Sequence, residues 1–196
     1  MLTGKKIGFG ITGSFCTIKE ILEPMRTLVE LNAKVYPIVT DIVYNSSSRF
    51  HDRDEFLGEL KSITGNDVIY SIDEAEIFGP IMPLDMMVVA PMTGNSMAKL
   101  AYGITDTAVL MAAKATLRNK NSLVIAPCTN DALGMNGINI MKLINTEHIY
   151  FVPFGQDNPV SKPSSMTANL DKLVETIELA FDKTQIQPLI IENFKK

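Results

Sequence analysis

Residues 86–101 constrain the fold of this chain more than any other segment does. An apolar run over residues 86–90 ends at Pro91, four small or polar residues follow, and residues 96–101 have a helical composition. This order predicts a buried strand, a tight polar loop and the start of a helix. Ligands bind at the carboxyl ends of strands in open α/β sheets. Because the first N–H groups of a helix lack intrahelical partners, the loop is suited to an anion such as a phosphate.

Two further loops are expected at the same edge of the sheet, over residues 10–14 and 126–130. The turn at residues 12–14 supplies two hydroxyls and a glycine before a helix, which suits a phosphate. It equally suits a simple cap, with Thr12 or Ser14 capping the helix. The turn at residues 93–96 is ambiguous in the same way, since Asn95 or Ser96 would cap well. Two such turns at one sheet edge favour phosphate binding.

Apolar periodicity predicts that strands and helices alternate along the chain. Strands are expected at residues 7–11, 35–40, 67–70, 85–90, 123–126 and 149–152. Helices are expected at residues 18–32, 54–63, 95–102, 107–117 and 166–183, with a helical turn at 73–78 and a helix late in 131–145. This alternation predicts a mostly parallel sheet with helices on both faces. We therefore predict a single-domain α/β fold over residues 1–196, flavodoxin-like (Rossmann-like), with a doubly wound parallel sheet.

Local signals add detail to this fold. Pro24 should kink or break the first helix, which Asn32 closes. Pro37 suggests an edge strand or a bulge. Residues 41–53 are polar and rich in serine, which indicates a mobile loop, and residues 153–165 are expected to be a long loop. Asp106 is the expected N-cap of the helix at 107–117. Residues 189–191 form a short apolar tail, expected to pack on the sheet or on a neighbouring subunit.

Composition limits the classes of partner and compartment. A chain of 196 residues can bury the core of one domain. The net charge of −4 provides no basic surface for nucleic acid. No apolar run reaches membrane-spanning length, and the N-terminal residues do not resemble a signal peptide. Two cysteines are too few for a disulfide framework. We therefore expect a cytoplasmic protein that binds neither nucleic acid nor membrane.

A glycine motif leaves a nicotinamide-binding alternative open. Gly8, Gly10 and Gly13 satisfy the G-x-G-x-x-G pattern of dinucleotide-binding proteins. In that pattern the first glycine lies in the turn after the strand. Because Ile7 alone precedes Gly8 as apolar strand, we instead place Gly8 and Gly10 inside the strand. Asp41 would be the ribose ligand of a nicotinamide site, although a solvated loop acid is the favoured interpretation.

Other reactive side chains carry weaker signals. Cys16 and Cys128 follow strands without a flanking histidine, so both are expected to be small buried apolar residues. His51 and His148 are expected to be structural or solvated. The sequence lacks H-E-x-x-H, C-x-x-C and G-x-S-x-G, so it supports no metal site and no serine hydrolase or thioredoxin-like chemistry. Three basic side chains are expected on solvated helix faces: Lys99, Lys114 and Arg118.

The loops together resemble those of the FMN-binding flavoprotein family, which includes phosphopantothenoylcysteine decarboxylases and lantibiotic cysteine decarboxylases. Residues 10–14 resemble its first phosphate loop, and residues 90–99 with 103–106 resemble its second. Gly94 stands where the family usually has alanine. Pro127 and Asn130 keep the outer positions of a family Pro-Ala-Met-Asn motif. Ser71 stands where the decarboxylases have a histidine, so the resemblance implies FMN without implying cysteine decarboxylation.

The resemblance also implies which residues would hold FMN. Loop residues would bind the phosphate and ribityl chain, with Thr40 or Ser46 adding a phosphate contact, and residues 127–130 would flank the ring. Asn130 is the expected catalytic residue in contact with substrate. The implied cofactor-binding residues are Gly10, Thr12, Gly13, Ser14, Thr40, Pro91, Thr93, Gly94, Asn95, Ser96, Pro127, Cys128 and Thr129.

A closer resemblance covers nearly the whole chain. Residues 110–119, 129–134, 150–157 and 162–166 are similar to one subgroup of this family. Its members are subunits of an oxidoreductase that makes an aromatic pyridine dicarboxylate in endospore-forming bacteria. The other subunit resembles a nicotinamide-binding dehydrogenase, so NAD(P) is expected on that partner. Relatives bind FMN between subunits, which implies a homotrimer or a multiple of one. Two alternatives stay open: a non-catalytic partner subunit, and a stand-alone nicotinamide-binding oxidoreductase.

Overall fold

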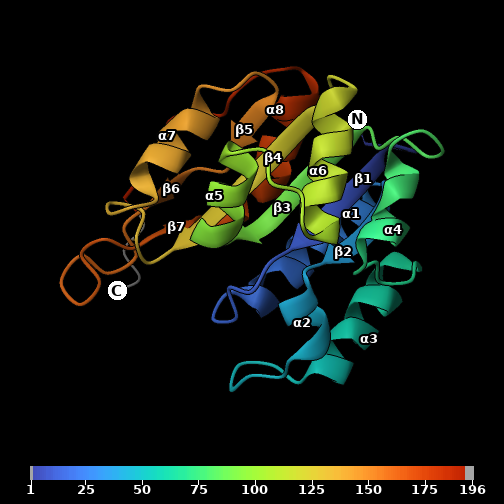
Figure 1. The fold of residues 1–196 in the computed structure, drawn as a ribbon, viewed down its shortest axis with the longest axis horizontal. Coiled ribbons are helices and arrows are strands. Elements are labelled where there is room, and N and C mark those ends of the chain that lie inside the picture. The colour runs from blue at the N-terminus through green and yellow to red at the C-terminus, as the bar shows by residue number, and fades with distance from the viewer. Residues whose placement is uncertain (1, 193–196) are drawn as a thin grey trace.

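A seven-stranded sheet forms the centre of the molecule (Figure 1). The structure is a computed structural model that describes residues 2–192; the ends of the predicted 1–196 domain, residue 1 and residues 193–196, lie outside the described part. The strand order is β2-β1-β3-β4-β7-β6, and β5 also pairs with β4. All pairs among β1 to β5 are parallel, whereas β7 pairs antiparallel with both β4 and β6. The strands are β1 (Lys6–Ile11), β2 (Lys34–Val39), β3 (Met86–Met92), β4 (Ser122–Thr129), β5 (Ile149–Phe151), β6 (Phe154–Gly155) and β7 (Met166–Ala168).

Helices cover both faces of the sheet (Figure 1). Alternate residues of β3 enter different cores: Val88 packs in the core of α1, α3 and α8, and Val89 in the core of α5, α6 and α7. This alternation is the expected consequence of the strand pleat and confirms the predicted doubly wound fold. The α-helices are α1 (Leu22–Glu30), α2 (Asp41–Asn45), α3 (Arg53–Thr64), α4 (Ile72–Ala75), α5 (Gly94–Ala101), α6 (Ala108–Arg118), α7 (Gly137–Ile144) and α8 (Leu173–Phe181). Three short 3-10 helices are η1 (Ile18–Ile21), η2 (Glu76–Phe78) and η3 (Leu170–Lys172).

The glycines of β1 leave space for apolar side chains of neighbouring elements. A Cβ on Gly8 would lie 2.5 Å from Leu84 Cδ1, and one on Gly10 would lie 2.7 Å from Met87 Cε and 2.9 Å from Val109 Cγ1. Both glycines lie inside β1, as predicted from the sequence. Because apolar side chains occupy this space, the first two glycines of the motif do not form a phosphate turn.

Several local predictions are confirmed. The first helical segment breaks into η1 and α1, with Pro24 in the first turn of α1. Asn32 follows that helix with a φ of 62°. Strand β2, which contains Pro37, lies at the end of the strand order. The tail at residues 189–191 packs on the sheet, where Ile190 bridges Phe154.

Four predictions of secondary structure were wrong. Residues 154–155 form β6 inside the loop predicted at residues 153–165, because they pair with β7. Residues 41–45 form α2 instead of a mobile loop, because Val43 is buried in the core below. Residues 67–70 form no strand beyond a single bridge between Ile69 and Ile38. Residues 166–168 form β7 instead of starting a helix, since they pair with the end of β4, where Thr167 lies opposite Cys128. Helix α8 therefore starts at Leu173.

Strands β3 and β4 also extend further than predicted. Pro91 does not end β3, because the pairing with β4 shifts register between Val89 and Met92, and Met92 then lies opposite Pro127. A proline is tolerated where the ladder is irregular, since its missing N–H then breaks no regular hydrogen bond. The extensions carry the ends of both strands to one edge of the sheet, beside the loop after β1.

Candidate functional site

Thr12 joins the first two loops. Its hydroxyl donates to the carbonyl oxygen of Pro91 at 2.9 Å and accepts from the backbone N–H of Thr93 at 2.9 Å. Its side chain is buried, with 1% of its surface exposed. Ser14 donates to Cys128 Sγ at 2.9 Å. The alternative in which Thr12 or Ser14 caps the first helix is therefore wrong, because both hydroxyls bind neighbouring segments instead.

Thr93 sets the geometry of the second loop. Its hydroxyl accepts from the N–H of Ser96 at 3.3 Å and so caps α5. The expectation that Asn95 or Ser96 is the cap was wrong, because the helix starts earlier, at Gly94. Asn95 and Ser96 consequently lie in the first turn of α5. Thr93 holds the N–H of Ser96, so the N–H groups of Gly94 and Asn95 are the ones without an intrahelical partner.

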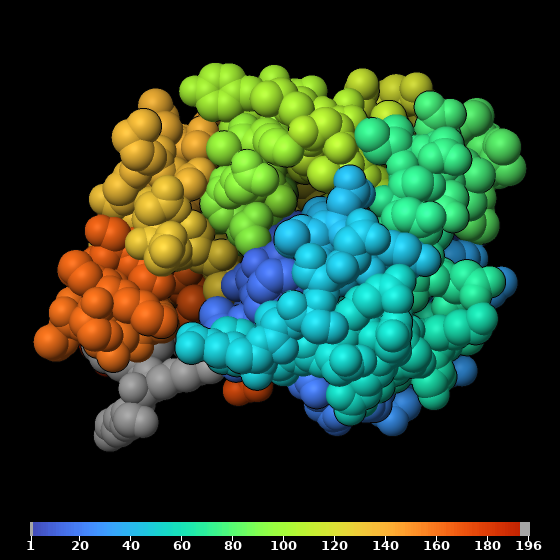
Figure 2. Space-filling view, turned by 60° about the horizontal axis from the view of Figure 1, so that its bottom comes forward, coloured from blue at the N-terminus to red at the C-terminus, as the bar shows by residue number. Residues whose placement is uncertain are grey.

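A pocket of about 370 Å³ lies between these loops and α2. Figure 2 shows the blue N-terminal region between the sky-blue region that contains α2 and the yellow-green region that contains α5. Six of the predicted cofactor-binding residues line this pocket, so the structure brings together segments from three strand ends. The lining residues are Thr12, Gly13, Thr40, Asp41, Ile42, Thr93, Asn95, Ser96, Lys99 and Thr107.

Thr40 presents an unpaired hydroxyl at this pocket. Only 6% of the residue is exposed, and its Oγ1 has no hydrogen-bond partner among the described residues. Thr40 occupies the N-cap position of α2, yet its side chain makes no capping bond. A buried hydroxyl without a partner costs free energy that a bound acceptor would recover. Ser46, the other candidate for this contact, does not line the pocket.

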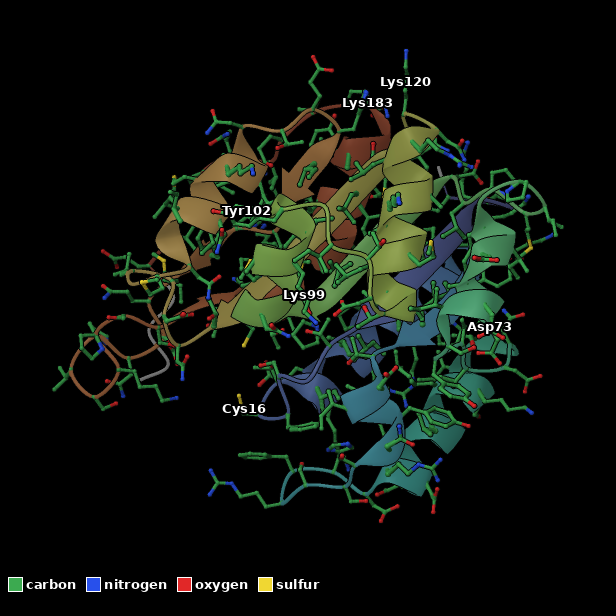
Figure 3. The ribbon with its side chains drawn as sticks, in the orientation of Figure 1. Cys16, Asp73, Lys99, Tyr102, Lys120 and Lys183 are labelled. Atoms are coloured by element: carbon green, nitrogen blue, oxygen red, sulfur yellow. The ribbon has the colours of Figure 1, made fainter. Side chains whose placement is uncertain are left out.

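Lys99 is a site residue that sequence reasoning missed. We expected its side chain on a solvated helix face, but it lines the pocket with 27% of its side chain exposed. Lys99 extends from α5 (Figure 3). Its ammonium lies 2.6 Å from Asp106 Oδ2. The expected capping role of Asp106 was also wrong, because Thr107 caps α6. The signal for Lys99 was its position one helical turn after Ser96, which places both on one face of α5.

The third loop lies beside this pocket rather than in its lining. Thr129 Oγ1 hydrogen-bonds Asp131, which accepts from Asn136 Nδ2 at 2.8 Å. A Cβ on Gly94 would lie 2.5 Å from Asn136 Nδ2 and 2.6 Å from Thr129 Oγ1. Asn130 is exposed in the turn after β4. Its predicted contact with substrate stays a prediction, as do the predicted cofactor contacts of Pro91 and Pro127; Gly10 lies outside the pocket.

The two cysteines meet beside the first loop. Cys128 is buried as expected, but Cys16 is exposed, so the expectation of two buried apolar residues was wrong for Cys16. A hydrogen bond from Cys128 lowers the pKa of Cys16 to about 6, with further lowering by Ser14 and by the charge of Lys162, while partial burial opposes the shift. The same hydrogen bond and burial raise the pKa of Cys128.

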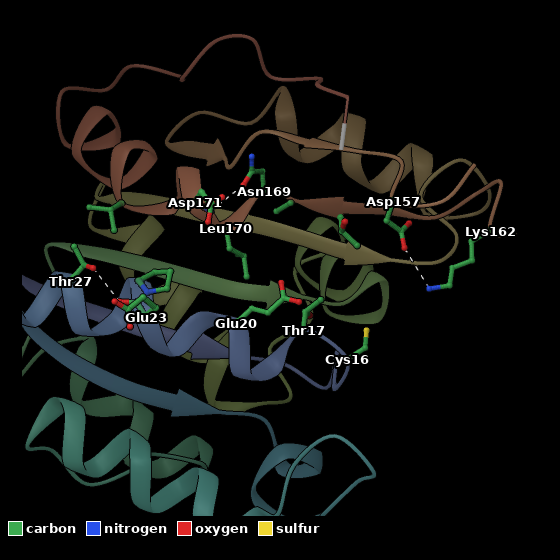
Figure 4. A pocket seen from close by; sticks show the side chains of 14 residues that line it. Cys16, Thr17, Glu20, Glu23, Thr27, Asp157, Lys162, Asn169, Leu170 and Asp171 are labelled. Atoms are coloured by element: carbon green, nitrogen blue, oxygen red, sulfur yellow. Dashed lines mark hydrogen bonds and ion pairs between the residues drawn. The ribbon is translucent and has the colours of Figure 1, made fainter. Parts of the chain in front are cut away.

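Cys16 also lines a larger cavity of about 830 Å³, between the η1–α1 segment and residues 157–174 (Figure 4). Lys162 Nζ lies 3.5 Å from Asp157 Oδ2 at one end of this cavity. Burial would raise the pKa of Asp157, but the Ser165 hydroxyl and Lys162 outweigh it and lower that pKa. The exposed thiol of Cys16 and the ion pair of Lys162 with Asp157 thus line the same cavity.

The histidines are not placed as catalytic groups. His51 is 3% exposed and stacks on Phe15 with ring centroids 5.0 Å apart, and its Nδ1 lies 2.9 Å from Ser48 Oγ. Burial lowers the pKa of His51, which favours the neutral ring beside the first loop. Ser71, at the position of the decarboxylase histidine, caps α4 in a capping box with Glu74.

Within residues 2–192, no cluster of three or more His, Cys, Asp or Glu side chains could hold a metal ion. No helix in that same stretch is long and apolar enough to cross a membrane.

Comparisons with known proteins agree with this geometry. The family model described as Flavoprotein matches residues 1–179. The B subunit of dipicolinate synthase from Bacillus subtilis (strain 168) is 50% identical over 194 residues, which cover 99% of this chain and 97% of that protein.

Solved structures give the same result. The crystal structure of the B subunit of dipicolinate synthase from Bacillus halodurans C matches with a TM-score of 0.91 and 53% identity, covering 98% of this chain and 99% of that one. The FMN binding protein AtHal3 shares the fold, with a TM-score of 0.62 and 19% identity over 93% of this chain and 99% of that chain. On its fold and on these similarities, the chain belongs to the Flavoprotein family and is a homologue of the B subunit of dipicolinate synthase.

Proposed function

We propose that this chain is the flavin-binding subunit of a dipicolinate synthase. In this proposal it binds FMN and, with the A subunit of dipicolinate synthase, oxidises a dihydrodipicolinate-type intermediate to dipicolinate. The observation that carries the proposal is the buried, unpaired hydroxyl of Thr40 in a pocket that also holds Lys99 and the start of α5. The names of the relatives support the assignment of substrate and partner.

The chemistry of the pocket fits the phosphate of FMN. A phosphate needs a cation and several hydrogen-bond donors, and helix N-termini supply donors with a favourable dipole. Here Lys99 supplies the cation, Thr40 a free hydroxyl, and the first turn of α5 the N–H groups. The side chains of Asn95 and Ser96 add polar contacts for the phosphate or the ribityl chain.

The residues at the end of β4, with Asn130 after it, are the proposed surroundings of the flavin ring. Pro127, Cys128 and Thr129 end a strand beside the first loop, with Ser14 bonded to Cys128. Asn130 follows them, is exposed, and is proposed to bind the substrate through its side-chain amide. Bound FMN supplies a hydride acceptor for a reaction that aromatisation of the substrate ring drives. The chain itself would position the ring and the substrate.

The proposal includes an assembly with further subunits. Exposed apolar side chains gather on and near α7, including Met135 at 86%, Ile138 at 69% and Met141 at 52% exposure. Such patches are typical of interaction surfaces. We propose a homotrimer, or a multiple of one, that associates with the dehydrogenase-like A subunit, and that this partner carries NAD(P).

Titration with FMN tests the cofactor. The chain should quench FMN fluorescence, and Lys99→Met should raise the dissociation constant roughly tenfold to hundredfold, since a charge-assisted hydrogen bond contributes about 1.5–3 kcal/mol. Lys114→Met is the matched control, because Lys114 lines a different pocket. A chain that fails to bind FMN, or equal effects of the two substitutions, would contradict the assigned pocket.

Reconstitution with the dehydrogenase-like partner tests the reaction. The mixture should form dipicolinate in an FMN-dependent manner, and Asn130→Ala should lower its rate while leaving FMN binding unchanged. Full activity without FMN would instead favour the non-catalytic partner role, which is supported by the absence of a base at Ser71. The stand-alone nicotinamide enzyme has less support, because Gly8 and Gly10 lie inside β1.

A further inference from the structure

The two cysteines of the chain converge on one hydroxyl. Ser14 Oγ lies 2.9 Å from Cys128 Sγ and 4.0 Å from Cys16 Sγ, and Thr17 Oγ1 lies 3.6 Å from Cys128 Sγ. Both thiols therefore lie around the Ser14 hydroxyl. They come from segments 112 positions apart in sequence, so the fold, and not chain proximity, brings them to the same hydroxyl.

The two thiols differ in access and in charge. Cys16 is exposed and lines the large cavity, whereas Cys128 is buried at the end of β4. Lys162 faces Cys16 across that cavity, and its charge favours the thiolate (Figure 4). An accessible thiolate next to a buried thiol is the arrangement in which one cysteine reacts first and the second resolves the product.

We propose that Cys16 and Cys128 form a redox-active thiol pair that low-molecular-weight disulfides oxidise to an intramolecular disulfide. The Cys16 thiolate attacks one sulfur of the small disulfide, whose S–S bond breaks and releases one thiolate. The Cys128 thiol gives its proton to that thiolate and attacks Cys16 Sγ, which releases the second small thiolate. The pair loses two electrons, and the small disulfide is reduced to one thiol and one thiolate, which takes its proton from solvent.

The hydroxyls around Cys128 support the second step, because Ser14 Oγ lies 2.9 Å and Thr17 Oγ1 3.6 Å from its Sγ. The hydrogen bond to Cys16 is the largest cause of the raised pKa of Cys128. This contribution ends when Cys16 enters the mixed disulfide, and the hydroxyls of Ser14 and Thr17, which lower the pKa of Cys128, remain. The disulfide would tie the first loop to β4. The proposal goes beyond the flavin function and does not depend on it.

Mass analysis of the full-length protein tests the pair. The reduced chain is exposed to oxidised glutathione, quenched with acid and digested with trypsin without reductant. We expect the monomer to lose two hydrogen atoms and peptide 7–19 to be linked to peptide 121–142, which together contain both cysteines of the chain. Cys128→Ser should stop at a stable glutathione adduct on Cys16, and Cys16→Ser should form no disulfide.

The rate at which Cys16 reacts distinguishes a reactive cysteine pair from two cysteines that lie close together by chance. Lys162→Met should slow the reaction of Cys16 several-fold, whereas Lys114→Met, on the opposite face of the sheet, should leave it unchanged. Wild-type protein that retains a glutathione adduct on Cys16 under folding conditions would overturn the proposal. Linked peptides found only in dimers, or equal rates for wild type and Lys162→Met, would overturn it as well.

Discussion

At the scale of single residues, a substitution at Thr40 distinguishes a hydroxyl that binds a ligand from one that caps a helix. Thr40→Val should leave the stability of the unliganded chain unchanged or slightly higher, because its Oγ1 has no partner to lose among the described residues. A true capping threonine would instead cost about 1 kcal/mol. The same substitution should raise the dissociation constant for FMN roughly tenfold or more, since a hydrogen bond to a charged group is lost.

Denaturant unfolding and FMN titration measure the two effects of Thr40→Val separately. Thr116→Val is the control, because Thr116 is buried but donates to Ala112 within α6 at 2.8 Å. Its affinity for FMN should match that of wild type. A Thr40→Val chain that loses stability and keeps its FMN affinity would show that the hydroxyl is structural.

A second residue-scale prediction concerns the pH dependence of Cys16. The groups that face this thiol are Cys128 from β4, Glu20 from η1, and Lys162 with its partner Asp157 from the loop across the cavity. The rate of alkylation of Cys16 by iodoacetamide follows its thiolate fraction. Because the pKa is lowered to about 6, the rate should rise from pH 5, be half-maximal near pH 6 and level off by pH 8.

Peptide mapping of the alkylated chain follows this reaction at each pH. Lys162→Met should move the midpoint of the Cys16 profile to higher pH, because a charge that stabilises the thiolate is removed. Lys114→Met is the control, and its Cys16 profile should keep the midpoint of the wild-type chain. A midpoint near that of an ordinary cysteine, about pH 8.5, would be inconsistent with the hydrogen bonds described around Cys16.

At the scale of elements, Gly94 sets how closely α5 approaches the end of β4. Gly94→Ala should destabilise the chain, because the new Cβ would lie within 2.6 Å of both Asn136 and Thr129. Asn136 cannot easily yield, since it donates to Asp131 at 2.8 Å and accepts from Asn139 at 2.9 Å. Overpacking of this kind costs about 1–3 kcal/mol.

Calorimetry measures the effect of Gly94→Ala as a fall in Tm of roughly 2–12 °C, from about 2–4 °C per kcal/mol for a chain of this size. Gly58→Ala is the matched control, because Gly58 lies in α3 with open space around its Cβ position. That change should stabilise the chain by about 0.5–1 kcal/mol. Equal and positive shifts for both substitutions would mean that α5 moves freely away from β4.

The helices and strands also show which parts of the fold can be predicted from the sequence. Strong local patterns predicted β3 and the helix after it, because a continuous apolar run and small capping residues depend on near neighbours. Helix α2 and strand β7 were missed, since the first depends on burial of Val43 and the second on pairing with β4. Lys99 was missed for the same reason: its direction is set by the distant first loop and by Asp106.

At the scale of the whole molecule, the pocket joins three strand ends that lie far apart in the chain. A ligand that contacts all of them stabilises the folded state and not the unfolded one. At a concentration of one hundred times its dissociation constant, FMN should add about 2.7 kcal/mol to the free energy of unfolding. For a chain of this size we therefore expect Tm to rise by roughly 5–10 °C.

Riboflavin at the same concentration distinguishes phosphate recognition from general flavin binding. It lacks the phosphate that Lys99 and Thr40 are proposed to bind, so its shift in Tm should be much smaller than that of FMN. Lys99→Met should reduce the FMN shift toward the riboflavin value and leave the riboflavin shift unchanged. Equal shifts for the two flavins would place the flavin outside this pocket, because only FMN offers an anion to the joined strand ends.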